Sequence, residues 1–419
     1  MDPISGTDGE RDIVVKNGMI AEVGRGLRRK ANSHANVIDA KGFVVSPGFV
    51  DVHVHLREPG FEYKEDIESG TRAAVAGGFT SVCCMPNTDP VNDNASVTSY
   101  ILKRAKMLGL ARVYPVSAIS KGLKGEAMAD IGDQAGAGAV ALSDDGRPVM
   151  NSLLMRRAAE YASSFGLPIM DHCEDLNLSA GGVMNEGALS TELGLRGVPH
   201  AAEEVHVARD IALARLTGAH FHITHVSTAG SLDMIRAAKK KRLNITCDVT
   251  PHHIALTDEA VRGYSTSTKM SPPLRSAGDV KEILKALADG TIDAIATDHA
   301  PHGLIDKELG FDTAASGVIG LETALPVVLS LVHDKKISLR RMLELLTNGM
   351  NVLKRSEFHR GLKKGAVADI TIFDPEEKIT ISSGEFYSKS RNTPFEGWKL
   401  KGAVKYTIVE GKIVHARNL

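Results

Sequence analysis

Little in this sequence marks a secreted, membrane-bound or nucleic-acid-binding protein. It has only four cysteines in 419 residues, Cys83, Cys84, Cys173 and Cys247, and no two of them form a Cys-x-x-Cys pair. Free thiols in a reducing compartment are therefore expected. No apolar run approaches the length of a membrane span, which argues against a membrane-spanning helix.

The chain also has almost no net charge. Lysine and arginine total 50, and aspartate and glutamate total 51. Nothing therefore favours binding to nucleic acid, to another polyanion or to an acidic membrane surface. The first twelve residues are polar and acidic, unlike a signal or transit peptide, so a cytoplasmic location is expected. The length and the 43 % hydrophobic content suit a protein with a large core.

Histidine, by contrast, is frequent: there are sixteen, several of them in tight local clusters. The most informative stretch is 49–60, Phe-Val-Asp-Val-His-Val-His-Leu-Arg-Glu-Pro-Gly. On a strand, His53 and His55 would point to one face, with Arg57 following on the same face. Glu-Pro-Gly ends the strand, because proline lacks an N–H and glycine permits a turn. The stretch predicts a metal ion at a strand end with a guanidinium beside it.

The two ends of the chain have the pattern of short β-strands. Predicted strands are 12–16 and 19–23, joined by the hairpin signal Asn17-Gly18, then 37–38 and 43–45, and near the C-terminus 368–373, 405–409 and 412–415. We expect the two ends to pair into one small β domain.

Between the ends, apolar strands alternate with helices. The strand candidates are 79–85, 112–119, 138–142, 168–172, 221–226, 245–249 and 293–297. The helix candidates are 63–76, 95–108, 152–165, 201–216, 230–239 and 279–288. With the opening strand, about eight βα units in roughly 300 residues predict an α/β fold of the (β/α)8 barrel type. A doubly wound sheet is the alternative, but no Gly-x-Gly-x-x-Gly follows the first strand.

Nearly every predicted strand ends in polar residues able to bind metal or substrate. They lie at 53, 55 and 57, at 87, at 143–146, at 171–174, at 222–225 and at 297–302. In such barrels the chemistry takes place at the C-terminal strand ends, where these residues would converge on one or two Zn²⁺-type ions. Such ions activate water at neutral pH and polarise a carbonyl group, which indicates hydrolysis or formation of an amide-like bond.

Taken singly, each motif has an ordinary structural explanation. A lone His-x-His is more often structural than metal-binding, Asp144–Gly146 would be a solvated turn, and Asp298-His299 would be a polar pair at a strand end. Their joint placement at one end of successive strands argues against that explanation. His252 and His253 are assigned to loop packing. The histidines off the strand ends are given no role: His34, His200, His206, His220, His333, His359 and His415.

These motifs resemble a known family. The sequence is similar over nearly its whole length to the cyclic amidohydrolases, and most closely to the class I dihydroorotases of pyrimidine biosynthesis. The segments that carry the resemblance are Asp51–Gly60, Met85–Thr88, Ser143–Gly146, Asp171–Asp175, His222–Ser227, Pro272–Arg275, Ala296–His302 and Gly320–Thr323.

The resemblance implies a (β/α)8 TIM-type barrel with a small β-sandwich domain made from both termini. Residues 1–46 and 353–419 would form the sandwich, and 47–352 the metal-dependent hydrolase barrel. One or two Zn²⁺ ions per subunit are implied, the first held by His53, His55 and Asp298. His172 and His225 would hold the second, with Asp145 bridging the two. The choices of Asp145 over Asp144 and of His225 over His222 rest on the family motif, because spacing alone does not decide them.

The reaction implied is the reversible cyclisation of N-carbamoyl-L-aspartate to L-dihydroorotate, a step of de novo UMP synthesis. In the hydrolytic direction a metal-bound hydroxide attacks the ring amide, and Asp298 acts as general acid and base. By resemblance the substrate is held by His55, Arg57, Asn87, Ser271, His302, Ser316 and Gly317. The family pattern implies that Arg57 and Asn87 clamp the substrate carboxylate, and guanidinium and carboxylate pair strongly.

Three alternative functions fit the sequence less well. Dihydropyrimidinases and hydantoinases usually bridge their metals with a carbamylated lysine, and residues 140–146 contain no lysine. Allantoinases usually lack an arginine at the place of Arg57. A catalytically silent homologue could act as a scaffold for aspartate transcarbamoylase, but all six ligand positions are occupied as in active relatives. An active homodimer, the usual family state, that also binds the transcarbamoylase is compatible with the sequence.

The sequence departs from the family in two places. Many relatives have Asn-Pro-Pro-Leu-Arg where this chain has Ser271, so that substrate contact is expected to be weaker or relayed by water. The N-terminus looks short, since relatives usually have a strand and turn before the Asp-Pro found here at positions 2 and 3. One strand of the β domain is therefore expected to be missing.

Overall fold

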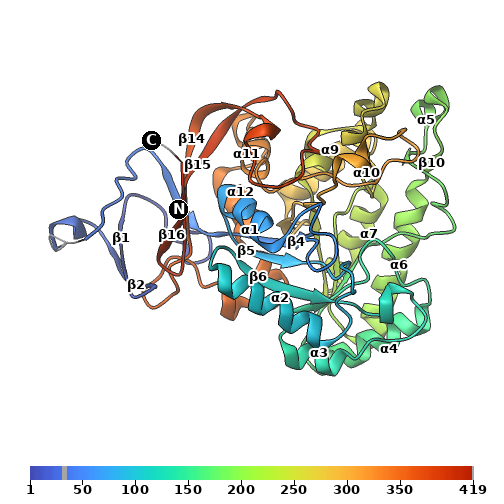
Figure 1. The fold of residues 1–419 in the computed structure, drawn as a ribbon, viewed down its shortest axis with the longest axis horizontal. Coiled ribbons are helices and arrows are strands. Elements are labelled where there is room, and N and C mark those ends of the chain that lie inside the picture. The colour runs from blue at the N-terminus through green and yellow to red at the C-terminus, as the bar shows by residue number, and fades with distance from the viewer. Residues whose placement is uncertain (31–34, 418–419) are drawn as a thin grey trace.

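Eight parallel strands form a nearly closed barrel in the computed structural model, which describes residues 1–30 and 35–417 (Figure 1). The strands are β4 (Phe49–Val54), β5 (Phe79–Cys84), β6 (Arg112–Ser117), β7 (Ala141–Leu142), β8 (Ile169–Asp171), β11 (Phe221–Ile223), β12 (Ile245–Val249) and β13 (Ala294–Ile295). They are neighbours in chain order. A parallel bridge between Val54 and His299 joins the first strand to the last. The predicted barrel is confirmed.

Helices surround the barrel on the outside (Figure 1). The longer ones are α1 (Ile67–Ala76), α2 (Ala95–Leu108), α3 (Ile131–Ala137), α4 (Ser152–Ser163), α6 (His200–Thr217), α7 (Ala229–Lys240), α9 (Ala277–Asp289), α11 (Ala324–His333) and α12 (Leu339–Thr347). Shorter elements lie in the connections: β9 (Met184–Asn185), α5 (Ala188–Leu193), β10 (Gly197–Val198), α8 (Pro251–Ala255), α10 (Leu304–Lys307) and α13 (Gly349–Val352).

Apolar side chains fill both faces of the barrel sheet. One cluster lies between strands and helices and includes Phe49, Phe79 and Phe221, all fully buried. A smaller cluster draws members from five consecutive strands, β4 to β8, and so fills the inside of the barrel; it includes Val52 and Met170. Burial on both faces explains why these strands are near-continuous apolar runs in the sequence.

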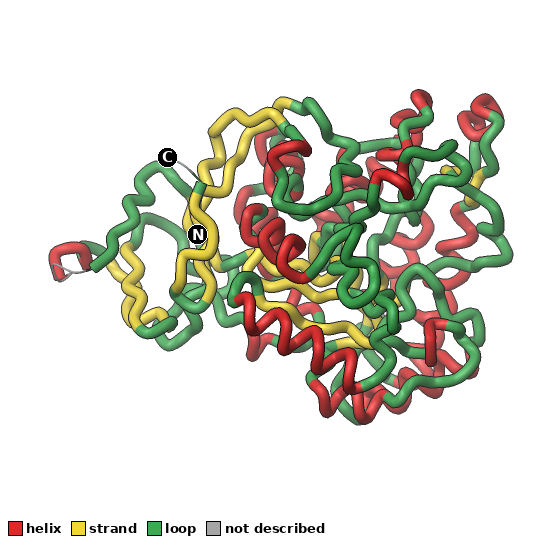
Figure 2. Tube along the Cα trace, in the orientation of Figure 1, coloured by secondary structure: helices red, strands yellow, loops and turns green. Residues whose placement is uncertain are grey.

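Strands from both termini form antiparallel β structure beside the barrel (Figure 2, yellow). β3 (Val44–Pro47) pairs with β14 (Ile370–Thr380), which is followed in the sheet by β15 (Lys399–Val409) and β16 (Lys412–Ala416). The hairpin β1 (Asp12–Lys16) and β2 (Met19–Gly24) turns at Asn17-Gly18, both with positive φ. The hairpin is tied to the C-terminal part through Ile20 N, which donates to Ala366 O at 2.8 Å. The predicted pairing of the two ends is confirmed.

A tight junction joins this sheet to the barrel. Gly48 alone separates β3 from β4, and a Cβ at Gly48 would lie 2.1 Å from Thr80 Oγ1, so only glycine fits there.

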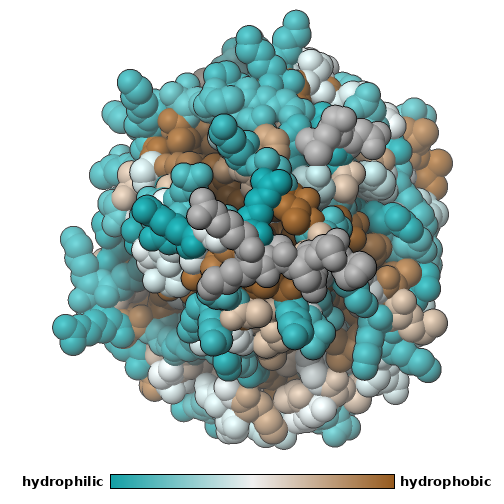
Figure 3. All heavy atoms as spheres, turned by 90° about the vertical axis from the view of Figure 1, so that its left-hand side faces the viewer, coloured by the Kyte–Doolittle hydropathy of each residue, from teal (hydrophilic) through white to brown (hydrophobic). Residues whose placement is uncertain are grey.

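The face of the molecule at the left of Figure 1 combines apolar side chains near its centre with hydrophilic ones around them (Figure 3). Val14 and Met19 of the hairpin are among the exposed apolar residues of the chain.

Several predicted bounds were wrong. Residues 37–38 form no strand, and β4 ends at Val54, before Arg57, whose φ of 61° does not fit an extended strand. α1 begins at Ile67 because Asp66 caps it, not at Tyr63. The sequence pattern does not predict the helices α3, α5, α11 and α12, and His34 lies outside the described residues. In the described ranges, no helix is long and apolar enough to cross a membrane.

Candidate metal centre

The six predicted metal ligands converge at the C-terminal end of the barrel. His53 lies near the end of β4 and His55 just beyond it, while the others follow four different strands: Asp145 after β7, His172 after β8, His225 after β11 and Asp298 after β13. All six are at least 93 % buried. Because parallel strands end at one rim, residues far apart in the sequence meet there.

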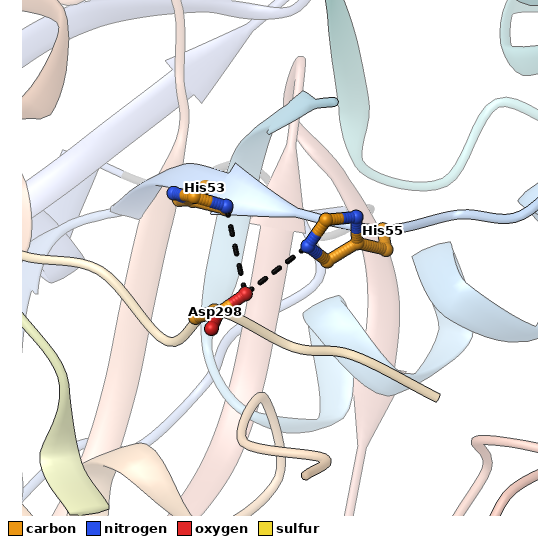
Figure 4. A group of neighbouring side chains, drawn as sticks. All are labelled: His53, His55 and Asp298. Carbon is orange, nitrogen blue, oxygen red and sulfur yellow. Dashed lines mark hydrogen bonds and ion pairs between the residues drawn. The ribbon is translucent and has the colours of Figure 1, made fainter. Parts of the chain in front are cut away.

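The first group joins β4 to β13 (Figure 4). Asp298 Oδ1 lies 3.5 Å from His53 Nε2 and 3.1 Å from His55 Nε2. Figure 4 shows both imidazoles facing this one carboxylate oxygen, His53 from the strand and His55 from just beyond its end. The predicted convergence of the two histidines on one point is therefore present, although only His53 lies within the strand.

Asp145 lies between this group and a second one. Its Oδ1 is 3.3 Å from His53 Nε2, and its Oδ2 is 3.5 Å from His55 Nε2. On the other side, Oδ1 is 3.8 Å from His172 Nδ1 and 3.7 Å from His225 Nε2. His172 Nδ1 and His225 Nε2 are 3.0 Å apart. The geometry is that of one carboxylate between two pairs of imidazoles.

These residues fit divalent metal ions. Ligand atoms of His53, His55 and Asp298, and likewise of His53, Asp145 and His225, lie within 4.8 Å of one another. Ligands about 2.1 Å from a tetrahedral ion stand about 3.4 Å apart, close to the separations found here. His53 Nε2 and Asp145 Oδ1 are buried without a hydrogen-bond partner among the described residues. Imidazole and carboxylate donors suit Zn²⁺ and similar ions.

The electrostatics also favour a cation. Burial alone would lower the pKa of His53, but Asp145 and Asp298 outweigh it and raise that pKa to about 10. Burial would raise the pKa of Asp145 and of Asp298, yet the surrounding imidazoles hold both well below the usual range. Two charged carboxylates at one buried point therefore require positive charge beside them.

Hydrogen bonds from outside the cluster orient its members. Glu174 Oε2 is 2.9 Å from His172 Nε2, which leaves Nδ1 facing Asp145. Asn87 Oδ1 is 2.8 Å from His55 Nδ1, which leaves Nε2 facing Asp298. Such partners fix the tautomer and the direction of a ligating histidine.

The structure separates the residues that spacing left undecided. Asp144 accepts N–H bonds from Ile119 at 2.8 Å and Ser120 at 3.0 Å, away from the histidines. His222 Nε2 is 2.8 Å from Asp248 Oδ2, and Asp248 Oδ1 in turn accepts the N–H of His225 at 2.7 Å. Asp145 and His225 therefore face the centre, while their neighbours brace the chain around it.

Three of the predicted site residues have strained backbones. Arg57, His225 and Asp298 have φ of 61°, 38° and 46°, in the left-handed region that side chains other than glycine rarely adopt. Each such residue costs on the order of 1–3 kcal/mol and persists only where surrounding contacts hold it. The strain lies where the side chains must turn inward from the strand ends.

The predicted substrate contacts fall into two sets. Arg57 Nε donates to Pro301 O at 3.1 Å, and a terminal guanidinium nitrogen lies 3.4 Å from His302 Nε2. His302 Nε2 is 2.8 Å from Ser316 O, and a Cβ at Gly317 would lie 3.0 Å from His302 Nε2. These residues form one side of the site. Ser271 lies apart from them, with Oγ 3.5 Å from Glu174 Oε2.

Some residues around the site were not identified from the sequence. Glu174 lies in segment 171–175, and the sequence pattern gives it no specific role. His253 packs the loop as predicted, with Nε2 3.1 Å from Pro272 O. His252 does not share that contact: its Nε2 is buried without a partner among the described residues. Lys307 and Asn392 bond to backbone carbonyl groups around Gly317, and no local pattern marks such contacts.

A barrel of this kind with histidine and aspartate at its strand ends suits the class of metal-dependent hydrolases. L-Hydantoinase from Arthrobacter aurescens matches the fold with a TM-score of 0.87 at 24 % identity, over 98 % of this chain and 93 % of that one. Dihydropyrimidinase from Brevibacillus agri matches with a TM-score of 0.81 at 22 % identity, over 98 % of this chain and 92 % of that one.

The sequence comparisons identify the family within that class. The family model described as Dihydro-orotase-like matches residues 42–231. The dihydroorotase of Geobacter metallireducens is 53 % identical over 418 residues, which is 100 % of this chain and 98 % of that protein. Those of Anaeromyxobacter dehalogenans and Geobacter sulfurreducens are 54 % and 55 % identical, each over 100 % of this chain and over 96 % and 98 % of theirs. The chain belongs to the dihydroorotase family.

Proposed function

We propose that this chain catalyses the reversible cyclisation of N-carbamoyl-L-aspartate to L-dihydroorotate in pyrimidine biosynthesis. The observation that carries the proposal is the Arg57 guanidinium beside a buried cluster of four histidines and two aspartates. A metal cluster alone suits many hydrolases, whereas a fixed cation next to it suits a cyclic amide that carries a carboxylate. Full-length similarity to proteins named dihydroorotase supports the same substrate.

The proposed cofactor is Zn²⁺, one or two ions per subunit. His53, His55 and Asp298 would hold the first ion, and His172 and His225 the second, with Asp145 between them. Bound there, Zn²⁺ would supply Lewis acidity that makes water nucleophilic at neutral pH and polarises the amide carbonyl. Asn87 and Glu174 would keep His55 and His172 in their ligating orientations.

Asp298 is the proposed general acid and base. In hydrolysis its carboxylate takes a proton from the attacking water and returns it to the ring nitrogen as the amide C–N bond breaks. In cyclisation it takes a proton from the terminal ureido nitrogen as that nitrogen bonds to the side-chain carboxyl carbon. It passes this proton to the departing carboxyl oxygen, which takes a second proton from solvent and leaves as water. Burial opposes the charged form, but the contacts with His53 and His55 outweigh it and keep this carboxylate charged, and hence able to accept a proton.

The substrate carboxylate would pair with Arg57, supported by Asn87 and His302. Burial lowers the pKa of Arg57, but the guanidinium remains charged at any working pH. Its bond to Pro301 O fixes its direction, which reduces the entropy lost on binding. Ser316 and Gly317 would contact the ring through their backbone. Ser271, which lies beside Glu174, would contribute through its hydroxyl group.

The alternatives fit these residues less well. A carbamylated lysine has no place at the bridging position, where Asp145 lies between both histidine pairs. An uncharged ring such as allantoin or dihydrouracil would leave the Arg57 charge without a partner in a buried site. A silent scaffold would have no need to keep six buried ligands.

We further propose that the protein is cytoplasmic and forms a homodimer, and that it can also bind aspartate transcarbamoylase. The four cysteines support the first point, since all are buried free thiols. The family resemblance supports the other two, which size measurement and co-purification would test.

The decisive variant is Asp298→Asn. The zinc-loaded wild type is expected to interconvert the two compounds in both directions. Asp298→Asn should lose at least about a hundredfold in kcat, because the amide cannot accept the proton. Asp334→Asn, an exposed aspartate at the end of α11, is the matched control and should keep full activity. Equal activity in Asp298→Asn would overturn the assignment of the base.

A further inference from the structure

The loop between β13 and α11 contains a buried lysine that the proposed mechanism does not use. Lys307, at the end of α10, is 7 % exposed. Its Nζ donates to Ala315 O at 2.8 Å and to Gly317 O at 2.9 Å, and it lies 3.4 Å from Lys269 O. Three carbonyl groups therefore accept the three protons of the ammonium group. Burial and the charge of Lys269 nonetheless lower the pKa of Lys307 to about 7, so Lys307 carries its full charge only below that pH. Among the described residues, no carboxylate forms an ion pair with it within 4.0 Å.

The bonds of Lys307 are part of a wider connection between two segments. Gly317 N donates to Lys269 O at 2.9 Å, and Lys269 Nζ donates to Asp312 O at 3.0 Å. Thr266 Oγ1 donates to Lys307 O at 2.8 Å. Segments 266–271 and 307–317 are thereby held as one unit. Lys307 lies at its centre, because its ammonium group contacts carbonyl groups of both segments.

Both segments carry proposed substrate contacts. Ser271 ends the first, and Ser316 and Gly317 end the second. We propose that Lys307 is a positioning residue for the substrate: it holds these two segments in place around the ligand and adds its positive charge to that of Arg57. This inference rests on the function proposed above.

The charge of Lys307 reaches the substrate side of the site. Burial lowers the pKa of His302, and the charges of Arg57, Lys64 and Lys307 lower it further. His302 in turn contacts Ser316 O. A charge felt at His302 is also felt by an anion bound beside Arg57. N-carbamoyl-L-aspartate carries two carboxylates and L-dihydroorotate one, so removal of this charge should weaken binding of the open form more.

The test compares Lys307→Met with Lys307→Arg and with Lys285→Met. Methionine keeps an unbranched chain of similar length without charge, and arginine keeps the charge. Lys285 is 62 % exposed in its side chain and pairs with Glu282, so it is the matched control. For each zinc-loaded protein we would measure kcat and KM in both directions. Backbone hydrogen exchange of segments 266–271, 307–317 and 221–226 would be followed in the same samples.

In Lys307→Met, KM for L-dihydroorotate should rise about tenfold, and KM for N-carbamoyl-L-aspartate more, with kcat within about threefold. Exchange should rise in both held segments and stay unchanged in 221–226. In Lys307→Arg the rise in KM should be smaller, and Lys285→Met should match the wild type.

Unchanged KM and exchange in Lys307→Met would overturn the inference, as would exchange that rises equally in 221–226, which would indicate general loosening. A fall in kcat at constant KM would also overturn it, because a positioning residue for binding acts on KM. Failure of the proposed function looks different: the wild type itself would then turn over neither compound. The substrate role of Lys307 would fall with it, whatever the exchange data.

Discussion

Asp144 and Asp145 are neighbours in the chain but have different surroundings. Asp144 accepts two backbone N–H groups from the loop after β6 and is also bonded to the Ser120 hydroxyl group. Asp145 faces four imidazoles. The two differ only in which side of a turn they occupy. Which of the two faces the histidines depends on the backbone amides of Ile119 and Ser120, which lie 25 and 24 residues before Asp144 in the sequence.

Glu174 gives a prediction at the same scale. Its carboxylate holds His172 Nε2 at 2.9 Å, so Glu174→Gln would weaken the orientation and basicity of a proposed zinc ligand. Loss of such a partner typically costs about 10–100-fold in metal affinity. We expect a loss of that size in zinc affinity, measured by competition with a chelator. Glu126→Gln, at an exposed position, is the control. Equal affinity in Glu174→Gln and wild type would show that His172 does not need this partner.

The buried carboxyl group of Glu322 should make the stability of the protein depend on pH. Burial raises its pKa from 4.5 to about 7, although the N–H groups of Tyr387 and Ser388 favour the charged form. The folded protein therefore holds a proton that the unfolded chain has lost, and this stabilisation disappears as the pH rises through about 7. Thermal unfolding of wild type and Glu322→Gln should show the wild type relatively more stable near about pH 5 than near about pH 8. A difference that is constant over this range, as expected for Glu126→Gln, would contradict it.

Much of the candidate site could be predicted at the residue scale, and the part that could not has a common cause. The histidines and aspartates follow predicted strands, so the barrel architecture brings them together. Lys307 and Asn392 act through backbone carbonyl groups that are distant in the sequence. No residue pattern records a bond to a carbonyl group 38 residues away.

At the scale of elements, local signals decided how well the bounds were predicted. α2 runs from Ala95 to Leu108 as predicted, because Asn94 caps its start through two N–H groups and Gly109, with φ of 62°, ends it. β7 and β13 are only two residues long, against five predicted for each. The length of a parallel strand depends on which neighbouring residues pair with it, and the apolar run alone does not define that.

The loop before α11 carries the prediction that belongs to this scale. Gly317 has φ of 130°, and a Cβ there would lie 2.8 Å from Ala300 Cβ and 3.0 Å from His302 Nε2. Gly317→Ala should displace the loop and raise KM at least about tenfold while zinc content is kept. Gly290→Ala is the matched control, since Gly290 has φ of 86° but open space around it. Equal kinetics in both variants would mean that the loop does not position the substrate.

At the scale of the whole molecule, closure of the barrel and formation of the site are one event. Asp51 accepts the N–H of Thr297 at 3.1 Å and that of His53 at 3.0 Å, so the first and last strands meet directly below the metal cluster. In the sheet made from both termini, β3 ends only one residue before β4 begins, so this sheet adjoins the start of the barrel. We propose that residues 1–46 and 353–419 form the β domain and that residues 47–352 form the barrel domain.

The central claim is that a metal centre and a fixed guanidinium together select a cyclic amide with a carboxylate. The most direct measurement is the rate at which the purified, zinc-supplemented chain hydrolyses L-dihydroorotate, with dihydrouracil, hydantoin and allantoin as parallel substrates. Turnover of L-dihydroorotate and of none of the uncharged rings is the predicted result. Turnover of an uncharged ring at a comparable rate would contradict the role given to Arg57, and no turnover of any ring with zinc bound would contradict the enzyme itself.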